Sequence, residues 1–176
     1  MFSDPQQNLS QAGIGEGMFV ADIGSGSGFY SLAAARMVGD KGRVFSVDIQ
    51  KELLQKLKNT AQAQRLFNIE IVWGNVEKLG GTKIRDASID FVLVSNILFQ
   101  IEQKKDFVRE VRRILKRTGK ALIVDWSDSF GGMGPQPEFV FSEADAKKLF
   151  EDGGMHVERS ILAGDHHYGF VAQQGV

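Results

Sequence analysis

The sequence predicts an α/β protein, a three-layer sandwich in which a seven-stranded, mostly parallel sheet has helices on both faces. Short apolar runs rich in Val, Ile and Phe alternate with longer segments of helical periodicity, as strands and crossover helices do in parallel sheets. A glycine-rich stretch separates the first apolar run from the first helical segment. The last two apolar runs are joined by turn residues, which predicts an antiparallel C-terminal hairpin strand.

The first part of the chain is expected to alternate strand and helix twice. Residues 18–23 form the first strand and residues 29–38 the helix that follows, which Gly39 and Gly42 end. Residues 44–48 form the second strand. An apolar stripe then predicts an amphipathic helix, with its inner face at Leu53, Leu54, Leu57 and Ala61.

The middle of the chain predicts three further strands. The third spans residues 69–73, and the fourth spans residues 89–95, an almost wholly apolar run typical of a strand in the middle of a sheet. A helical stripe follows, which Gly119 is expected to end before a fifth strand at residues 120–126. The inner positions of that helix are Phe107, Val108, Val111, Ile114 and Leu115.

A glycine and proline-rich loop, residues 127–140, precedes the last helix. Ser142 and Asp145 have the spacing of a capping box at its start. Two strands at residues 155–162 and 166–172 then complete the predicted hairpin.

The bulk properties predict a single domain, residues 1–176, with a short N-terminal segment at residues 1–17. Lys and Arg number 21 against 22 Asp and Glu, so the net charge of -1 creates no field that would collect nucleic acid or an anionic membrane. The absence of Cys excludes disulfides and a cysteine nucleophile. No export signal or long apolar run occurs, so we expect a cytoplasmic monomer or homodimer.

The most informative stretch is residues 20–28, Val-Ala-Asp-Ile-Gly-Ser-Gly-Ser-Gly, a strand that runs into a glycine turn and then a helix. Glycines at such a turn let a ligand approach the backbone closely. Two acids accompany it: Asp22, two residues before the first glycine, and Asp48, at the end of the second strand.

The two acids suggest different contacts with a nucleoside cofactor. An acid at the position of Asp48 can accept hydrogen bonds from both ribose hydroxyls, in dinucleotide and S-adenosylmethionine folds alike. A carboxylate at Asp22 would repel a pyrophosphate, but it can contact the methionine ammonium of S-adenosylmethionine, directly or through water. Position 29 is Phe, so the third glycine of the dinucleotide fingerprint is absent. S-adenosylmethionine is therefore the expected cofactor, with S-adenosylhomocysteine as its product.

On these residues the chain resembles the class I S-adenosylmethionine-dependent methyltransferases, a Rossmann-like family, particularly the small-molecule branch that includes ubiquinone and menaquinone biosynthesis enzymes. The resemblance is carried by residues 22–28, 47–49, 73–76, 89–96 and 115–123. It implies that Ile49 packs on the adenine, that Asn75 accepts from the adenine amine, and that the Val76 amide donates to the ring. The expected cofactor-binding residues are Asp22, Gly24, Ser25, Gly26, Ser27, Gly28, Tyr30, Asp48, Ile49, Gly74, Asn75, Val76, Ser95, Asn96 and Ile97.

The chain departs from that family pattern at Asn75, at Arg117-Thr118 where Pro-Gly is usual, and in its short N-terminal segment. Asn75 stands where Asp is usual, although an amide oxygen is also an acceptor. Only about seventeen residues precede the first strand, so the pocket is expected to be open or to be closed by a partner subunit. The segment from Ser95 to Leu98 lacks the Asn-Pro-Pro-aromatic sequence with which related enzymes hold a nucleic-acid base or a glutamine.

The catalytic candidates lie beyond the last strands. If the acceptor must lose a proton, Asp125, Asp128, His166 and His167 are placed to receive it. The alternative is that a strand-ending acid holds a loop, and that one His is exposed while the other packs on a helix. Adjacent strand residues point to opposite faces, so no metal site is expected at the two histidines. The loop at residues 127–140 should border the acceptor.

The expected activity is methyl transfer to a small molecule. The alternatives are a protein or RNA acceptor, and a catalytically idle cofactor-binding module that acts with a partner. Nucleic acid is disfavoured because the basic run at residues 104–117 is interrupted by acids and is expected to form the solvated side of a helix. A hydride-transferring oxidoreductase ranks last.

Overall fold

Seven strands form one mixed sheet in the order β3-β2-β1-β4-β5-β7-β6, in a computed structural model that describes residues 3–175. The five parallel strands come first in the chain and the hairpin last, so the predicted fold class is confirmed. The strands are β1 (Phe19–Ile23), β2 (Arg43–Asp48), β3 (Ile69–Trp73), β4 (Ile89–Ser95), β5 (Leu115–Trp126), β6 (Met155–Ile161) and β7 (His167–Gln174).

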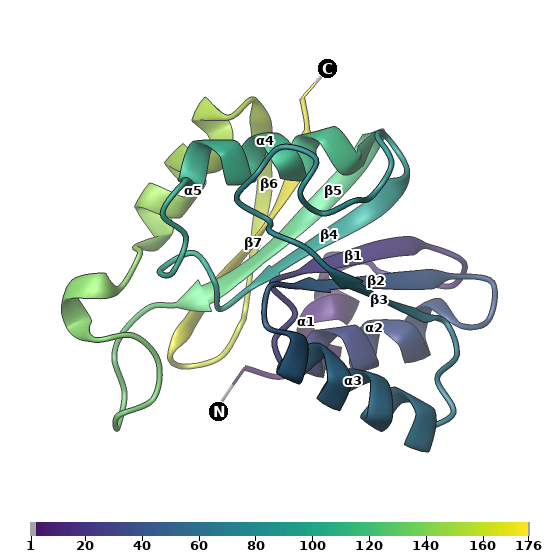
Figure 1. The fold of residues 1–176 in the computed structure, drawn as a ribbon. Coiled ribbons are helices and arrows are strands. Elements are labelled where there is room, and N and C mark those ends of the chain that lie inside the picture. The colour runs from purple at the N-terminus through teal and green to yellow at the C-terminus, as the bar shows by residue number, and fades with distance from the viewer. Residues whose placement is uncertain (1–2, 176) are drawn as a thin grey trace.

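A different set of helices covers each face of the sheet (Figure 1). One layer holds α1, α2 and α3, and the opposite layer holds α4 and α5, so the sheet is covered on both faces as predicted. The helices are α1 (Pro5–Ala12), α2 (Phe29–Val38), α3 (Lys51–Ala63), α4 (Lys104–Ile114) and α5 (Glu143–Asp152), with a short 3₁₀ turn, η1, at Pro137–Phe139. Among the described residues, no helix combines the length and apolar composition that a membrane crossing requires.

The strand order reverses between β1 and β4, because the chain winds outward through β2 and β3 on one side and through β5 on the other. Val20 pairs with Val44 of β2 and with Phe91 of β4, so β1 lies between the two halves. Ligands of open α/β sheets bind beyond the carboxyl ends of the strands at such a reversal. The glycine turn after β1 and the segment after β4 therefore meet at the place where a ligand site is expected.

The predicted boundary between α4 and β5 is wrong by five residues, whereas the other strand ends agree within two. Gly119 does not end α4, because the helix stops at Ile114 and Leu115 is already extended and paired with Ile89. Leu115 is buried in both interpretations, so its place on the apolar stripe could not distinguish the last helical turn from the first strand residue. Gly119 instead lies inside β5, where an added Cβ would approach the Ile89 carbonyl oxygen to 3.1 Å.

The N-terminal segment contains a helix, α1, that the sequence analysis did not predict. The Asp4 side chain accepts from the amides of Gln6 and Gln7 at 2.9 and 3.2 Å and so caps it. Arg159 of β6 donates to the Ala12 carbonyl at its other end, at 3.2 Å. The segment before β1 is thus fastened to the hairpin, and its first residues reach the carboxyl end of the sheet.

The C-terminal part follows the prediction closely. Ser142 caps α5 by accepting from the amide of Asp145 at 3.1 Å. β6 and β7 form the antiparallel hairpin, and β7 also pairs with β5. The loop between β5 and α5 extends past the end of the sheet in Figure 1.

Candidate active site

A cleft lies beyond the carboxyl ends of β1, β2, β3 and β4, at the reversal of strand order. Eight of the predicted cofactor-binding residues line it: Gly24, Asp48, Ile49, Gly74, Asn75, Val76, Asn96 and Ile97. Four other lining residues were not predicted from the sequence, Gln50, Glu77, Gln100 and Ile101. All four follow a strand end within a few residues, which is the signal that could have found them.

A second hollow adjoins the cleft and shares Gly24 and Asn96 with it. Ser25, Tyr30 and Ser95 from the predicted set line it, together with Ser3, Pro5 and Phe29, which were not predicted. The remaining three glycine-turn residues of the predicted set, Gly26, Ser27 and Gly28, are not among the residues that line either hollow.

The glycine turn is held against β2. The amides of Gly24 and Ser25 both donate to the Val47 carbonyl, at 2.8 and 3.0 Å. Gly24 has a positive φ of 79°, and a Cβ there would lie 1.9 Å from the Ile97 side chain. Glycine is favoured at this position, because the left-handed backbone conformation strains other residues and an added Cβ would displace the end of the Ile97 side chain.

Asp48 ends β2 at the floor of the cleft. One carboxylate oxygen accepts from the Gly26 amide and the other from the Gln50 amide, each at 2.8 Å. These bonds fix the orientation of the carboxylate, and each oxygen keeps a further lone pair for a hydroxyl donor. The carboxylate is therefore preorganised to accept from a pair of hydroxyl groups.

Asp22 is fully buried between β1 and the start of α2. Ser31 donates to its Oδ2 at 2.6 Å, and Ser46 donates in turn to Ser31 at 2.7 Å. Burial raises the pKa of Asp22 to about 6, against these hydrogen bonds. Its Oδ1 has no hydrogen-bond partner among the described residues. Asp22 does not line the cleft, so its predicted contact with an ammonium group remains a prediction.

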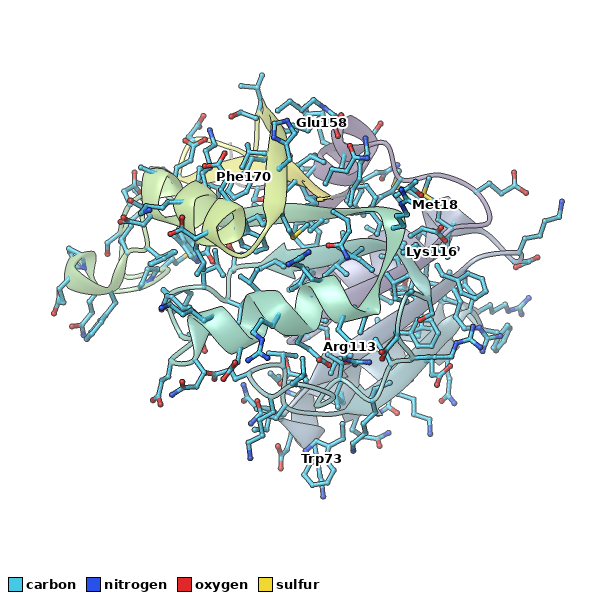
Figure 2. The ribbon with its side chains drawn as sticks, turned by 90° about the horizontal axis from the view of Figure 1, so that it is seen from above. Met18, Trp73, Arg113, Lys116, Glu158 and Phe170 are labelled. Atoms are coloured by element: carbon cyan, nitrogen blue, oxygen red, sulfur yellow. The ribbon has the colours of Figure 1, made fainter. Side chains whose placement is uncertain are left out.

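The cleft wall after β3 is built from a tight turn. The Asn75 side-chain oxygen accepts from the Glu77 amide at 2.9 Å, and the Asn75 amide donates to Gly81 at 3.2 Å. Across the cleft, Ile49 leaves 59% of its surface exposed. Trp73 donates from Nε1 to the Ile49 carbonyl at 3.0 Å, and Figure 2 shows this indole at the edge of the molecule. An exposed apolar side chain held rigidly at the rim is suited to pack on a flat ring.

A buried carboxylate on α4 holds the loop after β3, and the sequence analysis missed it. Glu110 accepts from the Gly80 amide at 2.7 Å and from the amide and hydroxyl of Thr82 at 3.0 and 2.6 Å. Arg113 donates to both of its oxygens at 2.8 Å and also pairs with Asp86. Figure 2 shows Arg113 beside α4, and with 18% of its side chain exposed it is not the solvated cation that its place in the basic run had indicated.

Asp125 is the penultimate residue of β5 and is almost fully buried. Its carboxylate accepts from the backbone amides of Ile97, Leu98 and Trp126. Burial raises the pKa of Asp125 to about 6, while those amides and Lys104 act in the opposite direction. The geometry agrees with the alternative that a strand-ending acid holds a loop.

The other three catalytic candidates gather beside the loop after β5. Asp128 bonds His166 at Nδ1, at 2.9 Å, and the imidazole stacks on Phe130 with 3.9 Å between ring centres. His167 packs on Trp126, with 4.3 Å between ring centres. Burial lowers the pKa of His167, so the neutral ring is favoured. Within residues 3–175, no three His, Asp or Glu side chains gather in a way that could hold a metal ion.

Tyr30 closes one side of the second hollow. Its hydroxyl accepts from the Asn8 side chain at 2.8 Å and lies 3.1 Å from the Ser3 hydroxyl. Burial raises the pKa of Tyr30. The hydroxyl of Ser25 and the side-chain oxygen of Asn96, both on residues that line the hollow, are buried without a hydrogen-bond partner among the described residues.

The groups that line the two spaces differ in chemistry. The cleft offers a carboxylate for two hydroxyls at Asp48, an exposed apolar face at Ile49 and an amide acceptor at Asn75, while the hollow offers orphaned polar atoms beside Gly24. A pyrophosphate finds no basic side chain among the residues that line either space. The fold and the cleft together define a Rossmann-like protein whose site lacks a basic side chain for a phosphate.

Comparison with known proteins identifies the family. A family model described as a methyltransferase domain matches residues 14–165, so the chain belongs to that family, within the class I S-adenosylmethionine-dependent methyltransferases. A solved structure, a SAM-dependent methyltransferase from Aquifex aeolicus, is 30% identical with a TM-score of 0.89, covering 98% of this chain and 90% of that one.

Two relatives of known name are longer than this chain. The ubiquinone/menaquinone biosynthesis C-methyltransferase UbiE of Enterobacter sp. (strain 638) is 32% identical over 120 residues, which are 66% of this chain and 45% of the relative. The arsenite methyltransferase of Homo sapiens is 29% identical over 116 residues, 62% of this chain and 31% of that protein. The chain therefore spans less than half of either relative.

Proposed function

We propose that this methyltransferase binds S-adenosylmethionine in the cleft and transfers its methyl group to a small organic molecule. The observation that carries the cofactor site is the preorganised carboxylate of Asp48 beside the exposed Ile49 and opposite the glycine turn. The support for a small acceptor is the near-neutral net charge and the small molecules in the names of the two relatives.

Each lining residue has a proposed role toward the cofactor. Asp48 accepts from the ribose hydroxyls, Ile49 packs on the adenine, and Asn75 with the Val76 amide contacts the polar edge of that ring. Asp22 contributes negative charge behind the glycine turn, where an ammonium group is favoured. The adjoining hollow, with Ser25, Ser95 and Asn96, receives the amino-acid end.

The bound cofactor supplies an electrophilic methyl group on a sulfonium. Much of the remaining work is alignment and the exclusion of water, because transfer to a neutral acceptor disperses charge. For an acceptor that loses a proton, we propose that His166 receives it at its imidazole, with Asp128 holding the ring at Nδ1. The loop at residues 127–140 borders the acceptor in this proposal, since it leaves the carboxyl end of β5.

An RNA acceptor has less support. Arg113 is engaged by Glu110 and Asp86, and Arg112 donates to the Gly153 carbonyl at 2.9 Å and to Gln174 at 3.2 Å. These two cations of the basic run therefore fasten the chain internally. Radiolabelled methyl transfer into total RNA or total protein, compared with a small-molecule extract, separates the acceptor classes.

Calorimetric titration with S-adenosylhomocysteine tests the cofactor site, with NADH as the control. We expect S-adenosylhomocysteine alone to bind, with micromolar affinity. Asp48→Ala should weaken it by about 100-fold or more, because two hydrogen bonds to a charged acceptor are lost. Binding of NADH instead, or an unchanged affinity of Asp48→Ala, would refute the assignment.

A further inference from the structure

A single turn of backbone after β4, residues 96–101, forms one wall of the cleft; we call it the β4 turn. The Gln100 amide donates to the Ile97 carbonyl at 2.9 Å, and the Ile101 amide donates to Leu98 at 3.3 Å. Asn96 enters the turn with a φ of 53°, in the left-handed region that non-glycine residues seldom occupy. Such a conformation persists only where the surroundings hold it.

The first amides of the β4 turn have no acceptor within the turn, as at any helical start. Asp125 supplies the acceptor for these amides. Its Oδ2 accepts from the Ile97 amide at 3.1 Å and from the Leu98 amide at 2.7 Å. Its Oδ1 accepts from the Trp126 amide at 2.8 Å, which fixes the carboxylate itself. With 1% of its surface exposed, Asp125 makes these bonds away from competing water.

The position of Ile97 sets the gap between this wall and the glycine turn. A Cβ on Gly24 would lie 1.9 Å from Ile97 Cδ1, so the Ile97 side chain lies directly on that glycine. Movement of the β4 turn by an ångström would therefore change the cleft at the point where it meets the second hollow.

The far end of the wall is fastened separately. Glu77 accepts from the amides of Glu102 and Gln103 at 2.9 and 2.7 Å, and Lys104 donates to the Ile101 carbonyl at 2.5 Å. Asp125 is thus the anchor for the beginning of the segment, on the side that faces the glycine turn.

We propose that Asp125 is a positioning residue whose carboxylate holds the β4 turn against the glycine turn and so shapes the cofactor cleft. All three of its hydrogen bonds go to backbone amides, and it does not line either hollow. It therefore acts through Ile97 and Leu98 and does not exchange a proton with the acceptor. This inference rests on the proposed function, because it takes the cleft to be the cofactor site.

The test compares Asp125→Asn with Asp152→Asn, the same chemical change at an exposed acid on α5. Calorimetry with S-adenosylhomocysteine should show affinity about 10- to 100-fold weaker for Asp125→Asn, because an amide cannot accept from all three donors. Asp152→Asn should stay within about twofold of wild type. In the ligand-free proteins, amide hydrogen exchange at Ile97 and Leu98 should be faster in Asp125→Asn by at least about tenfold.

A folded Asp125→Asn protein with wild-type affinity for S-adenosylhomocysteine, or with unchanged exchange at Ile97 and Leu98, would overturn the inference. If that variant does not fold, exchange in the wild-type chain decides: saturating S-adenosylhomocysteine should protect both amides further, and equal protection overturns the proposal. Absence of binding to the wild-type chain overturns the proposed function and the inference together. Equal affinity of the wild type and Asp125→Asn for S-adenosylhomocysteine would refute only the inference about Asp125. The two outcomes can therefore be told apart.

Discussion

Replacing Glu110 by glutamine should destabilise the protein far more than its place on an amphipathic helix suggests. The buried carboxylate accepts from Gly80, from both donors of Thr82 and from two nitrogens of Arg113. A glutamine presents one oxygen and one NH₂ group in the same space, so donors would face a donor and Arg113 would lose its buried partner. Removal of one partner of a buried ion pair lowers the free energy of unfolding by about 3–5 kcal/mol.

The matched control is Asp106→Asn, on the same helix. Asp106 pairs with Arg109 at 3.0 Å, with both side chains largely exposed, so the change should cost less than about 1 kcal/mol. Urea unfolding followed by circular dichroism measures both variants at pH 7. Equal destabilisation by the two substitutions would refute the reasoning, because it would mean that the buried network contributes no more than a surface pair.

The acid dependence supplies a second check on Glu110. Its hydrogen bonds to Arg113, Thr82 and Gly80 lower the pKa of Glu110 from 4.5 to about 2, against the effect of burial. A folded-state pKa below the unfolded value stabilises the protein fully above about pH 4.5, and this contribution is lost as the pH falls through about 2. Glu110→Gln should therefore reduce the fall in stability over that range, and an unchanged acid profile would contradict the assignment.

Three further substitutions test other parts of the site. Because burial raises the pKa of Asp22 from 3.8 to about 6, its protonated form stabilises the fold below pH 3.8 and this contribution, on the order of 3 kcal/mol, is lost as the pH rises through 6. Asp22→Asn should reduce the pH dependence of the free energy of unfolding, measured with urea, between pH 4 and 6. A pH dependence equal to that of the wild type would contradict this role of Asp22. Trp73→Phe removes the donor to Ile49, so calorimetry should show S-adenosylhomocysteine binding about 3- to 10-fold weaker, and unchanged affinity would refute this role. Gly24→Ala places a Cβ against Ile97 at a positive φ, and it should abolish measurable S-adenosylhomocysteine binding; a variant that binds normally would show that the wall can move.

The alternation of strands and helices was predictable because its causes are local. Apolar runs and glycine stops lie within each segment, and a parallel sheet brings every strand's carboxyl end to one edge. Residues that follow different strands, such as Asp48, Asn75 and Asn96, were therefore expected to meet, and they line one cleft. The signals for α1 were also local, with Asp4 before a proline and Gly13 after the last turn, but eight residues are too few for a clear apolar stripe.

The contacts that shape the site join residues far apart in the chain. Glu110 and Thr82 are 28 residues apart, and the sequence shows only an acid three positions before Arg113, a spacing that is as common on solvated helices. Burial distinguishes the Glu110–Arg113 pair from a pair on a solvated helix, because it removes the water that would otherwise hydrate both charges. Burial is a property of the packed layers, and a single segment does not reveal it.

The order of the strands and of the helices from α2 onward, the glycine turn and the acids near the strand ends could be predicted from the sequence, since each depends on neighbours within a few residues. The role of each acid depends instead on the folded arrangement of the chain. Asp48 faces the cleft, Asp22 is enclosed behind it, and Asp125 is taken up by the amides of Ile97 and Leu98. Their carboxylates are chemically alike, so their roles follow from which groups the folded chain brings within hydrogen-bond distance and from how much water remains around them.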